Sequence, residues 1–203
     1  MLSINPSELG ERENYKFLTG SIIPRPVAIV TSLSEEGILN AAPFSYFNVV
    51  SSNPPLISIS VQRKNGQMKD TSRNVITRGE FVVHISDETY SKKMNITAKN
   101  LPSNESEVED AGLTPIESLK INVPGIKEAR VRMECVLERA ISLGGNEESP
   151  SCELLIGKIV QYHIQEDLYA FGRIDALKLK PLSRLAGNFY AKLGDTFELE
   201  RPQ

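Results

Sequence analysis

The chain has 203 residues, of which 40% are hydrophobic and 24% charged, proportions that are typical of soluble globular proteins. Its formal net charge of −3 argues against nucleic acid or an anionic membrane as a partner. Its two cysteines are too few for a disulfide framework, and we expect Cys135 and Cys152 to be free thiols.

The first residues are polar and charged, unlike a signal peptide, and no apolar run is long enough to cross a membrane. We therefore expect a cytoplasmic protein with no membrane partner. A chain of this length can bury one sizeable core. We expect a single domain over residues 1–203, with residues 99–129 as a long insertion within it.

A β-hairpin and a third strand are predicted in the first third of the chain, after a helical turn around residues 8–15. Residues 26–32 are rich in β-branched side chains and lack a helical period, which predicts a strand. Residues 35–37 provide a turn, and residues 38–46 return as the second strand of the hairpin. Residues 56–61 alternate between apolar and polar side chains and predict the third strand.

Helices are predicted on both sides of a fourth strand at residues 81–85. Asp70 or Thr71 is expected to cap the first helix, which Gly79 ends. The second helix is expected to start at residues 86–88, where two acids follow a capping serine.

Residues 99–129 are polar and interrupted by proline and glycine, and we expect short helical pieces there. The strand pattern resumes over residues 130–143 and 154–164. Six or more strands without a βαβ rhythm predict a mostly β fold, an antiparallel barrel with short helical insertions.

The sequence predicts no metal site and no catalytic side chain. Both histidines lie in predicted strands, and no cysteine or histidine stands at metal-ligand spacing from them. His84 is expected to be structural, whereas His163 could face a cleft. Nucleophile-elbow, Walker and Rossmann motifs are absent from the sequence.

The hexapeptide KDTSRN, residues 69–74, is a candidate anion site. The first N–H groups of a helix lack partners and carry partial positive charge, to which Lys69 adds a full charge. The hydroxyls of Thr71 and Ser72 are further donors. The alternative is that Asp70 or Thr71 caps the helix while the cations point into water, and the hexapeptide alone favours this alternative.

The segment APFSYFNVVSSNPPL, residues 42–56, is a second candidate site. Its small, hydroxyl and aromatic residues could meet a flat heteroaromatic ring through backbone hydrogen bonds and packing. It could equally be a core strand that runs into a polar turn, and the segment alone favours that interpretation.

Taken together, the motifs resemble the flavin reductase-like family with the FMN-binding split-barrel fold. The resemblance covers about residues 18–193, and its specific part is the ordered combination of RPVA, APFSYFN, SNPP and KDTSRN. It implies a six-stranded antiparallel Greek-key split barrel with short helical insertions. It also implies a homodimer that binds FMN without covalent attachment near the subunit interface.

The resemblance implies four groups of cofactor-binding residues. Those expected to border the isoalloxazine ring are Ser45, Tyr46, Phe47 and Asn48. Those expected near the ribityl chain and phosphate are Ser51 and Ser52, with Lys69 and Thr71 holding the phosphate and Asp70 and Asn74 supporting that loop. Those expected to reach the flavin from the first strand are Arg25 and Thr31. Those expected at or across the dimer interface are Arg184, Asn188 and Tyr190.

The implied activity is that of an FMN-binding oxidoreductase, which moves hydride or electrons from NAD(P)H to free flavin, ferric iron or a partner oxygenase. One departure concerns the Gly-Asp-His motif that the related NAD(P)H:flavin reductases carry before the strand matching residues 154–160. In this chain, the corresponding residues are Pro150-Ser151-Cys152. The missing histidine keeps two alternatives open: an FMN electron carrier without a nicotinamide site, and a flavin-binding sensor protein.

Overall fold

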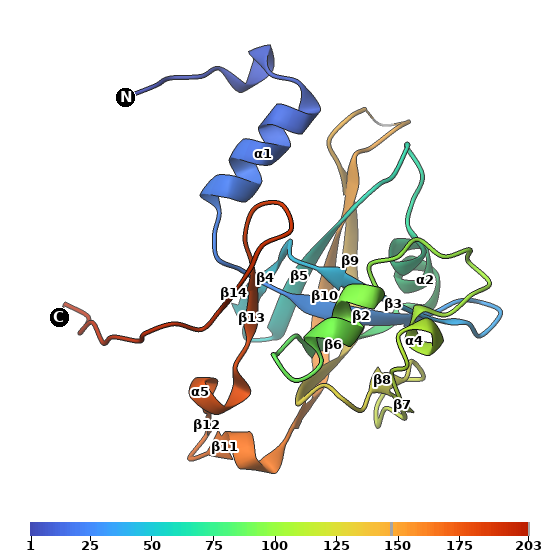
Figure 1. Cartoon of the computed structure of the whole chain (residues 1–203). Helices are drawn as coiled ribbons and strands as arrows, with labels where there is room; N and C mark the ends of the chain where they lie inside the picture. Colours follow the sequence, from blue (N-terminus) through green and yellow to red (C-terminus); the bar gives the residue numbers. More distant parts are fainter. Residues whose placement is uncertain (147, 203) are drawn as a thin grey trace.

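The computed structural model describes residues 1–146 and 148–202 (Figure 1). Within them, seven strands form one antiparallel sheet with the order β3-β2-β6-β9-β10-β5-β4. The strands are β2 (Ala28–Leu33), β3 (Leu39–Phe44), β4 (Phe47–Ser52), β5 (Pro55–Gln62), β6 (Glu80–Ile85), β9 (Val131–Leu143) and β10 (Cys152–Ile164).

The sheet closes into a barrel because its two edge strands are neighbours in the sequence. Phe44 ends β3 and Phe47 begins β4, although these strands lie at opposite edges of the sheet. The two residues between them can span only about 10 Å. The edges must therefore lie close together, which curls the sheet.

The predicted mostly β antiparallel barrel is confirmed, but the strand number differs from the expected six. The strand expected over residues 38–46 is too long. It ends at Phe44, and the chain bends at residues 45–46 before it returns as β4. Neither glycine nor proline occupies that bend, so the sequence lacks a marker for it.

The barrel interior is filled by apolar side chains that alternate along the strands. On β5, Ile57, Ile59 and Val61 are buried, while the serines between them face outward. The most constrained contact lies between Gly157 and Phe81, where a Cβ on the glycine would meet Phe81 Cζ at 2.3 Å. Only glycine fits at this position without displacing the aromatic ring.

Two of the helices lie in the first half of the chain. Helix α1 (Glu11–Ser21), preceded by the short η1 (Pro6–Glu8), replaces the helical turn expected around residues 8–15 and stands apart from the barrel (Figure 1). Helix α2 (Asp70–Arg78) packs against β2. It ends as predicted at Gly79, whose φ of +73° is favourable for glycine.

The expected helix start at residues 86–88 is wrong, because α3 spans Ser91–Ile96. The carboxylate of Asp87 accepts the backbone N–H of Thr89 at 2.7 Å and forms a turn instead. The predicted insertion does contain a short helical piece, α4 (Glu107–Asp110), together with β7 (Pro115–Ile116) and β8 (Gly125–Ile126). It covers the outer face of the barrel, where Val108 and Ile126 pack with Ile29.

The C-terminal part returns to the start of the barrel. It contains η2 (Glu166–Leu168), β11 (Tyr169–Ala170), β12 (Arg173–Ile174), α5 (Ala176–Leu179), β13 (Leu182–Arg184) and β14 (Tyr190–Lys192). Strand β13 pairs with β14 and with β1 (Arg25–Pro26), which places the C-terminal hairpin beside the first strand. None of the helices in the described ranges is both long and apolar enough to span a membrane.

Candidate functional site

A cavity of about 710 Å³ lies where α1, β1 and the C-terminal hairpin meet the barrel. The sequence-predicted site residues that line it are Arg25, Ser45, Tyr46, Lys69, Arg184, Asn188 and Tyr190. They come from segments that are far apart in the sequence. The pairing of β1 with β13 is what brings the C-terminal residues to Arg25, because Arg184 is the cross-strand partner of Arg25.

Arg25 lines this cavity and has one buried donor without a partner in the described residues. Its Nη1 donates to the carbonyl oxygens of Thr19 (2.8 Å) and Ile22, and its Nη2 donates to that of Leu185 at 2.9 Å. The residue is 7% exposed, and in the described part of the chain its buried Nε–H finds no acceptor. A buried cation with a spare donor at a cavity wall fits a ligand that supplies an acceptor oxygen or nitrogen.

The N-terminus of α2 is uncapped. Its cap residue is Lys69, and no side chain from the described residues accepts a hydrogen bond there. The expectation that Asp70 or Thr71 caps the helix is therefore wrong. Asp70 is already helical and forms an ion pair with Arg73, and the hydroxyl of Thr71 donates to Asn40 Oδ1 at 3.0 Å.

Lys69 stands between two adjoining cavities. The second cavity, of about 510 Å³, includes the start of α2 and shares Pro43, Phe44, Lys69 and Ala98 with the first. The Lys69 side chain has a large exposed area, yet the surrounding protein desolvates its ammonium enough to lower its pKa, and nearby Lys64 adds to this effect. A bound anion would offset both the desolvation of the Lys69 ammonium and its repulsion by Lys64.

Two expected phosphate-site residues are instead engaged in a buried network behind α2. Thr71 donates to Asn40, whose Nδ2 donates to Glu107 Oε2 at 2.9 Å. Asn74 donates to Ser32 Oγ at 3.2 Å. Thr71 lines the second cavity and Asn74 does not. Burial raises the pKa of Glu107, and this network holds α2 in place against the insertion.

The other predicted site residues lie away from the 710 Å³ cavity. Thr31 is buried and donates to Pro124 O at 2.8 Å, and Phe47 belongs to the barrel core. Asn48, Ser51 and Ser52 lie on the edge strand β4, none of them on the cavity wall. The side chains of Asn48 and Ser51 accept local backbone N–H groups, from Val49 and Asn53 respectively.

The C-terminal hairpin supplies a stacked pair to the cavity wall. The guanidinium of Arg184 lies 4.4 Å from the centre of the Tyr190 ring, and its Nη2 donates to Gly187 O. On the other side of the cavity, burial raises the pKa of Tyr46. A planar ligand would therefore meet a flat aromatic and guanidinium surface at this wall.

Sequence reasoning missed several lining residues, namely Tyr15, Thr19, Ser60, Gln62 and Asn95. Ser60 and Gln62 could have been found, since they alternate with the inward residues of β5. Tyr15 and Thr19 lie four residues apart on α1, so they share one helix face. Their place at the cavity depends on how α1 docks, which no local pattern encodes.

The two histidines differ as predicted. His84 is fully buried between Ile29 O, 3.0 Å from Nδ1, and the N–H of Ile126, which donates to Nε2 at 2.9 Å. Burial lowers its pKa to about 3, so it is a neutral structural residue, and the expectation is confirmed. His163 lines a separate cavity and contacts Glu134. Both thiols are free, with Cys135 buried.

The place of the missing Gly-Asp-His motif is at the start of β10. Ser151 O accepts the backbone N–H of Arg63 at 2.9 Å, which fixes this segment beside β5. Residues 150–152 do not belong to the wall of the 710 Å³ cavity formed by the described residues. Within one chain, the segment therefore supplies no side chain to the candidate site.

Comparisons with known proteins agree with this fold. A crystal structure of nitrilotriacetate monooxygenase component B from Bacillus cereus is 69% identical, with a TM-score of 0.97 over 98% of each chain. The 2-nitrobenzoate 2-nitroreductase of Pseudomonas fluorescens is 35% identical, with a TM-score of 0.84 over 99% of this chain and 96% of that one. The Bacillus subtilis protein YwrF is 52% identical over 100% of both chains.

The family comparison agrees with the resemblance seen in the motifs. The family model of the flavin reductase like domain matches residues 19–178, which is most of the chain and includes the RPVA, APFSYFN and KDTSRN motifs. The fold is the split barrel of flavin reductase-like proteins, as predicted. A flavin cofactor and a general flavin oxidoreductase role follow from this match. The chain belongs to the flavin reductase-like family.

Proposed function

We propose that the protein binds FMN and uses it to pass electrons from NAD(P)H to an acceptor, as the reductase component of an oxygenase system. The observation that carries this proposal is the uncapped start of α2, with Lys69 at the junction of the two cavities. Such a helix start offers free N–H groups and partial positive charge to a phosphate. Sequence alone favoured an ordinary capped helix there.

The residues present fit a flavin mononucleotide in two parts. The phosphate would be held by Lys69 and the first backbone N–H groups of α2. The ring would occupy the larger cavity beside Tyr46, with the spare Nε–H of Arg25 as a donor to a ring oxygen or nitrogen. Asn188 and the stacked Arg184–Tyr190 pair would close the other wall. We assign Thr71 and Asn74 a supporting role behind the phosphate.

The flavin itself accepts and releases the electrons, and the protein supplies binding, orientation and protection. No side chain is assigned as an acid or base. The high identity to a protein named as a monooxygenase component supports an oxygenase as the electron acceptor. The nicotinamide would enter through the open part of the larger cavity, where α1 contributes Tyr15.

A homodimer is part of the proposal. Two apolar surfaces support it: the exposed side of α1, with Phe17 and Leu18, and the edge strand β4, with Val49 72% exposed. A second copy that covered β4 would bring Asn48, Ser51 and Ser52 to a subunit interface, near which the family resemblance implies the FMN that these residues are expected to contact.

An FMN electron carrier is the second candidate. The observation that favours it is that residues 150–152 lack the histidine associated with the nicotinamide step in related reductases. A carrier would accept electrons from a protein donor and react slowly with nicotinamide.

Titration and anaerobic reduction test these proposals. The purified protein is titrated with FMN, FAD and riboflavin by fluorescence, then mixed anaerobically with NADH or NADPH while flavin absorbance is followed. We expect FMN to bind more tightly than riboflavin and to be bleached by a nicotinamide. Bleaching by dithionite or light alone would support the carrier. Failure to bind any of the three flavins would overturn both the reductase proposal and the carrier proposal.

A further inference from the structure

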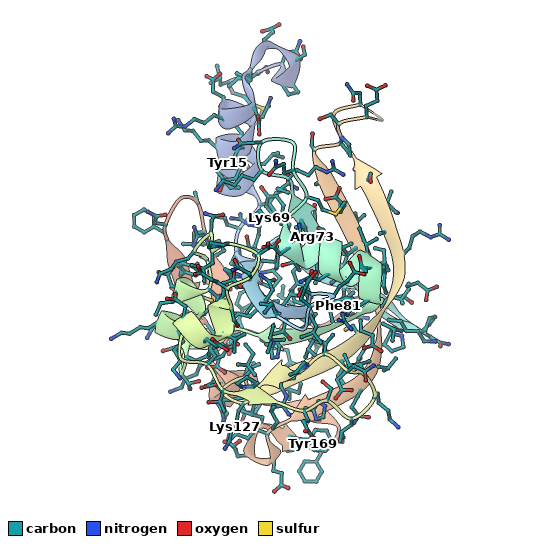
Figure 2. All side chains as sticks on the ribbon, turned by 90° about the vertical axis from the view of Figure 1, so that its right-hand side faces the viewer. Tyr15, Lys69, Arg73, Phe81, Lys127 and Tyr169 are labelled. Atoms are coloured by element: carbon teal, nitrogen blue, oxygen red, sulfur yellow. The ribbon has the colours of Figure 1, made fainter. Side chains whose placement is uncertain are left out.

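A further cavity, of about 770 Å³, lies on the outside of the barrel and shares no residue with the two cavities of the flavin site. Its wall is formed by Thr89, by residues 127–129 of the insertion with the adjoining Arg130, and by the paired ends of β9 and β10. Figure 2 shows Lys127, which belongs to it, below Lys69 and toward Tyr169.

The cavity is built on a row of basic side chains across three strands. Arg132 on β9 is the cross-strand partner of His84 on β6 and of His163 on β10. Directly paired residues of an antiparallel sheet point to the same face, so these three side chains lie next to one another. His84 is neutral and covered by the insertion, which leaves Arg132 and His163 on the cavity wall.

Two other charged residues of the wall are already neutralised. Arg130 forms an ion pair with Asp167 at 2.8 Å and also donates to Gln165 and to Lys178 O. Glu128 forms an ion pair with Lys93 at 2.9 Å and also accepts from Thr114. These residues shape the cavity but add little net charge to it.

Lys127 and Arg132 are the other cations of the wall, and the Glu134 carboxylate partly compensates Arg132 by favouring its charged form. Within residues 1–146 and 148–202, neither forms an ion pair with a carboxylate. Arg132 is half-buried, and its hydrogen bond to Ile126 O is a long one of 3.4 Å. A half-buried guanidinium with donors to spare can bind a ligand that supplies acceptor oxygens.

His163 is held at the wall by a fixed carboxylate. Its Nε2 lies 2.6 Å from Glu134 Oε1, and Glu134 also accepts the backbone N–H groups of Leu119 and Lys120, both at 2.7 Å. Burial alone would raise the pKa of Glu134, but these donors lower it, so the carboxylate stays charged and orients the imidazole. Tyr162, 50% exposed, also lines the cavity.

We propose that this cavity is a binding site for a small ligand with an oxyanion group, a carboxylate or a phosphate, held by Arg132 and Lys127. The guanidinium of Arg132 binds two oxygens of the group at once, which suits both kinds of oxyanion. Lys127 supplies the second charge, and His163 and Tyr162 border the ligand. The site is independent of the flavin, because no residue of its wall belongs to the two cavities of the flavin site.

Calorimetry on the flavin-loaded protein at constant ionic strength tests the proposal, with inorganic phosphate and benzoate as probes. We expect at least one probe to bind with a dissociation constant of about 1 mM or below. Saturation by phosphate alone points to a phosphorylated ligand, and saturation by benzoate to a carboxylate. Absence of saturable binding by both probes overturns the proposal.

The variants Lys127→Gln and Arg132→Gln identify the site. Each is expected to weaken probe binding about tenfold, because a hydrogen bond to a charged group is lost. Lys92→Gln, an exposed lysine of α3 away from the cavity, is the matched control and is expected to bind as the wild type does. Lys127 is exposed, so its variant folds even if Arg132→Gln does not. Wild-type affinity in Lys127→Gln overturns the assignment.

Discussion

The backbone N–H of Arg73 donates to the carbonyl oxygen of Lys69 at 3.1 Å, and this bond closes the first turn of α2. The N–H groups of the three residues between them point out of the helix start without an intrahelical acceptor. Arg73 also forms an ion pair with Asp70. This pairing compensates the negative charge of a carboxylate that would otherwise repel a phosphate. The turn is thus arranged to accept an anion.

The variant Lys69→Met tests this arrangement, because methionine keeps most of the length of the side chain and removes its charge. We expect the affinity for FMN to fall about tenfold or more, since a charge-assisted contact to the phosphate is lost. Riboflavin, which has no phosphate, should bind as before. Fluorescence titration measures both, and Lys92→Met is the matched control. An equal loss for riboflavin would show that Lys69 contacts the ring instead.

Thr71→Val is expected to act on stability more than on FMN affinity. Thr71 is 2% exposed and its hydroxyl donates to Asn40, so loss of the hydroxyl leaves a buried acceptor without this donor. We expect the free energy of unfolding to fall by about 1–3 kcal/mol in urea titrations. Thr77→Val, on the exposed face of the same helix, should change it little. A loss of FMN affinity as large as that of Lys69→Met would mean that Thr71 contacts the phosphate directly.

The sequence predicted those parts of the fold that depend on local alternation. Strand β5 was found from its alternation, with Ile57, Ile59 and Val61 buried, whereas β2 is buried on both faces and was found from its β-branched composition. The separate strand β4 was missed because the bend before it contains neither glycine nor proline. The predicted capping of α2 was wrong because Asp70 lies inside the helix and pairs with Arg73 one turn away. Residue propensity alone does not show such a pairing.

The candidate site was predicted only where a motif marked it. Lys69, Tyr46 and Arg25 line one cavity as the resemblance implied. Thr31 does not, because it points outward beneath the insertion, where Pro124 O accepts its hydroxyl hydrogen. Which strand residue faces a ligand depends on register and on the elements that cover the sheet, and these are long-range features. The contribution of Tyr15, on α1, could not be predicted for the same reason, because it depends on long-range packing.

Gly157→Ala tests the closest contact of the barrel core. The new methyl group would lie 2.3 Å from Phe81 Cζ, so the ring must move. We expect the free energy of unfolding to fall by about 1–3 kcal/mol, as overpacked cores do. The double variant with Phe81→Leu should recover part of this loss, because the smaller side chain leaves room.

The matched control for Gly157→Ala is Gly20→Ala. Gly20 lies in α1, and a Cβ added to it would meet no neighbouring atom within 4 Å, so alanine should be neutral or stabilising by up to about 1 kcal/mol. Urea unfolding measures all three variants. If the two glycine substitutions had the same effect, the contact with Phe81 would not be the cause.

The pH dependence of stability tests the neutral imidazole of His84. Burial lowers its pKa in the folded protein from 6.5 to about 3, whereas the unfolded chain takes up a proton near the ordinary value. Between these two pKa values the unfolded state binds more protons. The free energy of unfolding should therefore fall as the pH falls from 6.5 toward 3, by up to about 1 kcal/mol per pH unit from this residue.

His84→Gln removes this titration and keeps one donor and one acceptor for Ile29 and Ile126. Urea unfolding at about pH 7.5 and about pH 5 gives the loss of stability for the wild type and the variant. We expect a smaller loss in His84→Gln, because the imidazole no longer takes up a proton on unfolding. His163→Gln is the control, since it keeps the buried His84. A loss in His84→Gln as large as that of the wild type would mean that the folded protein already holds His84 protonated.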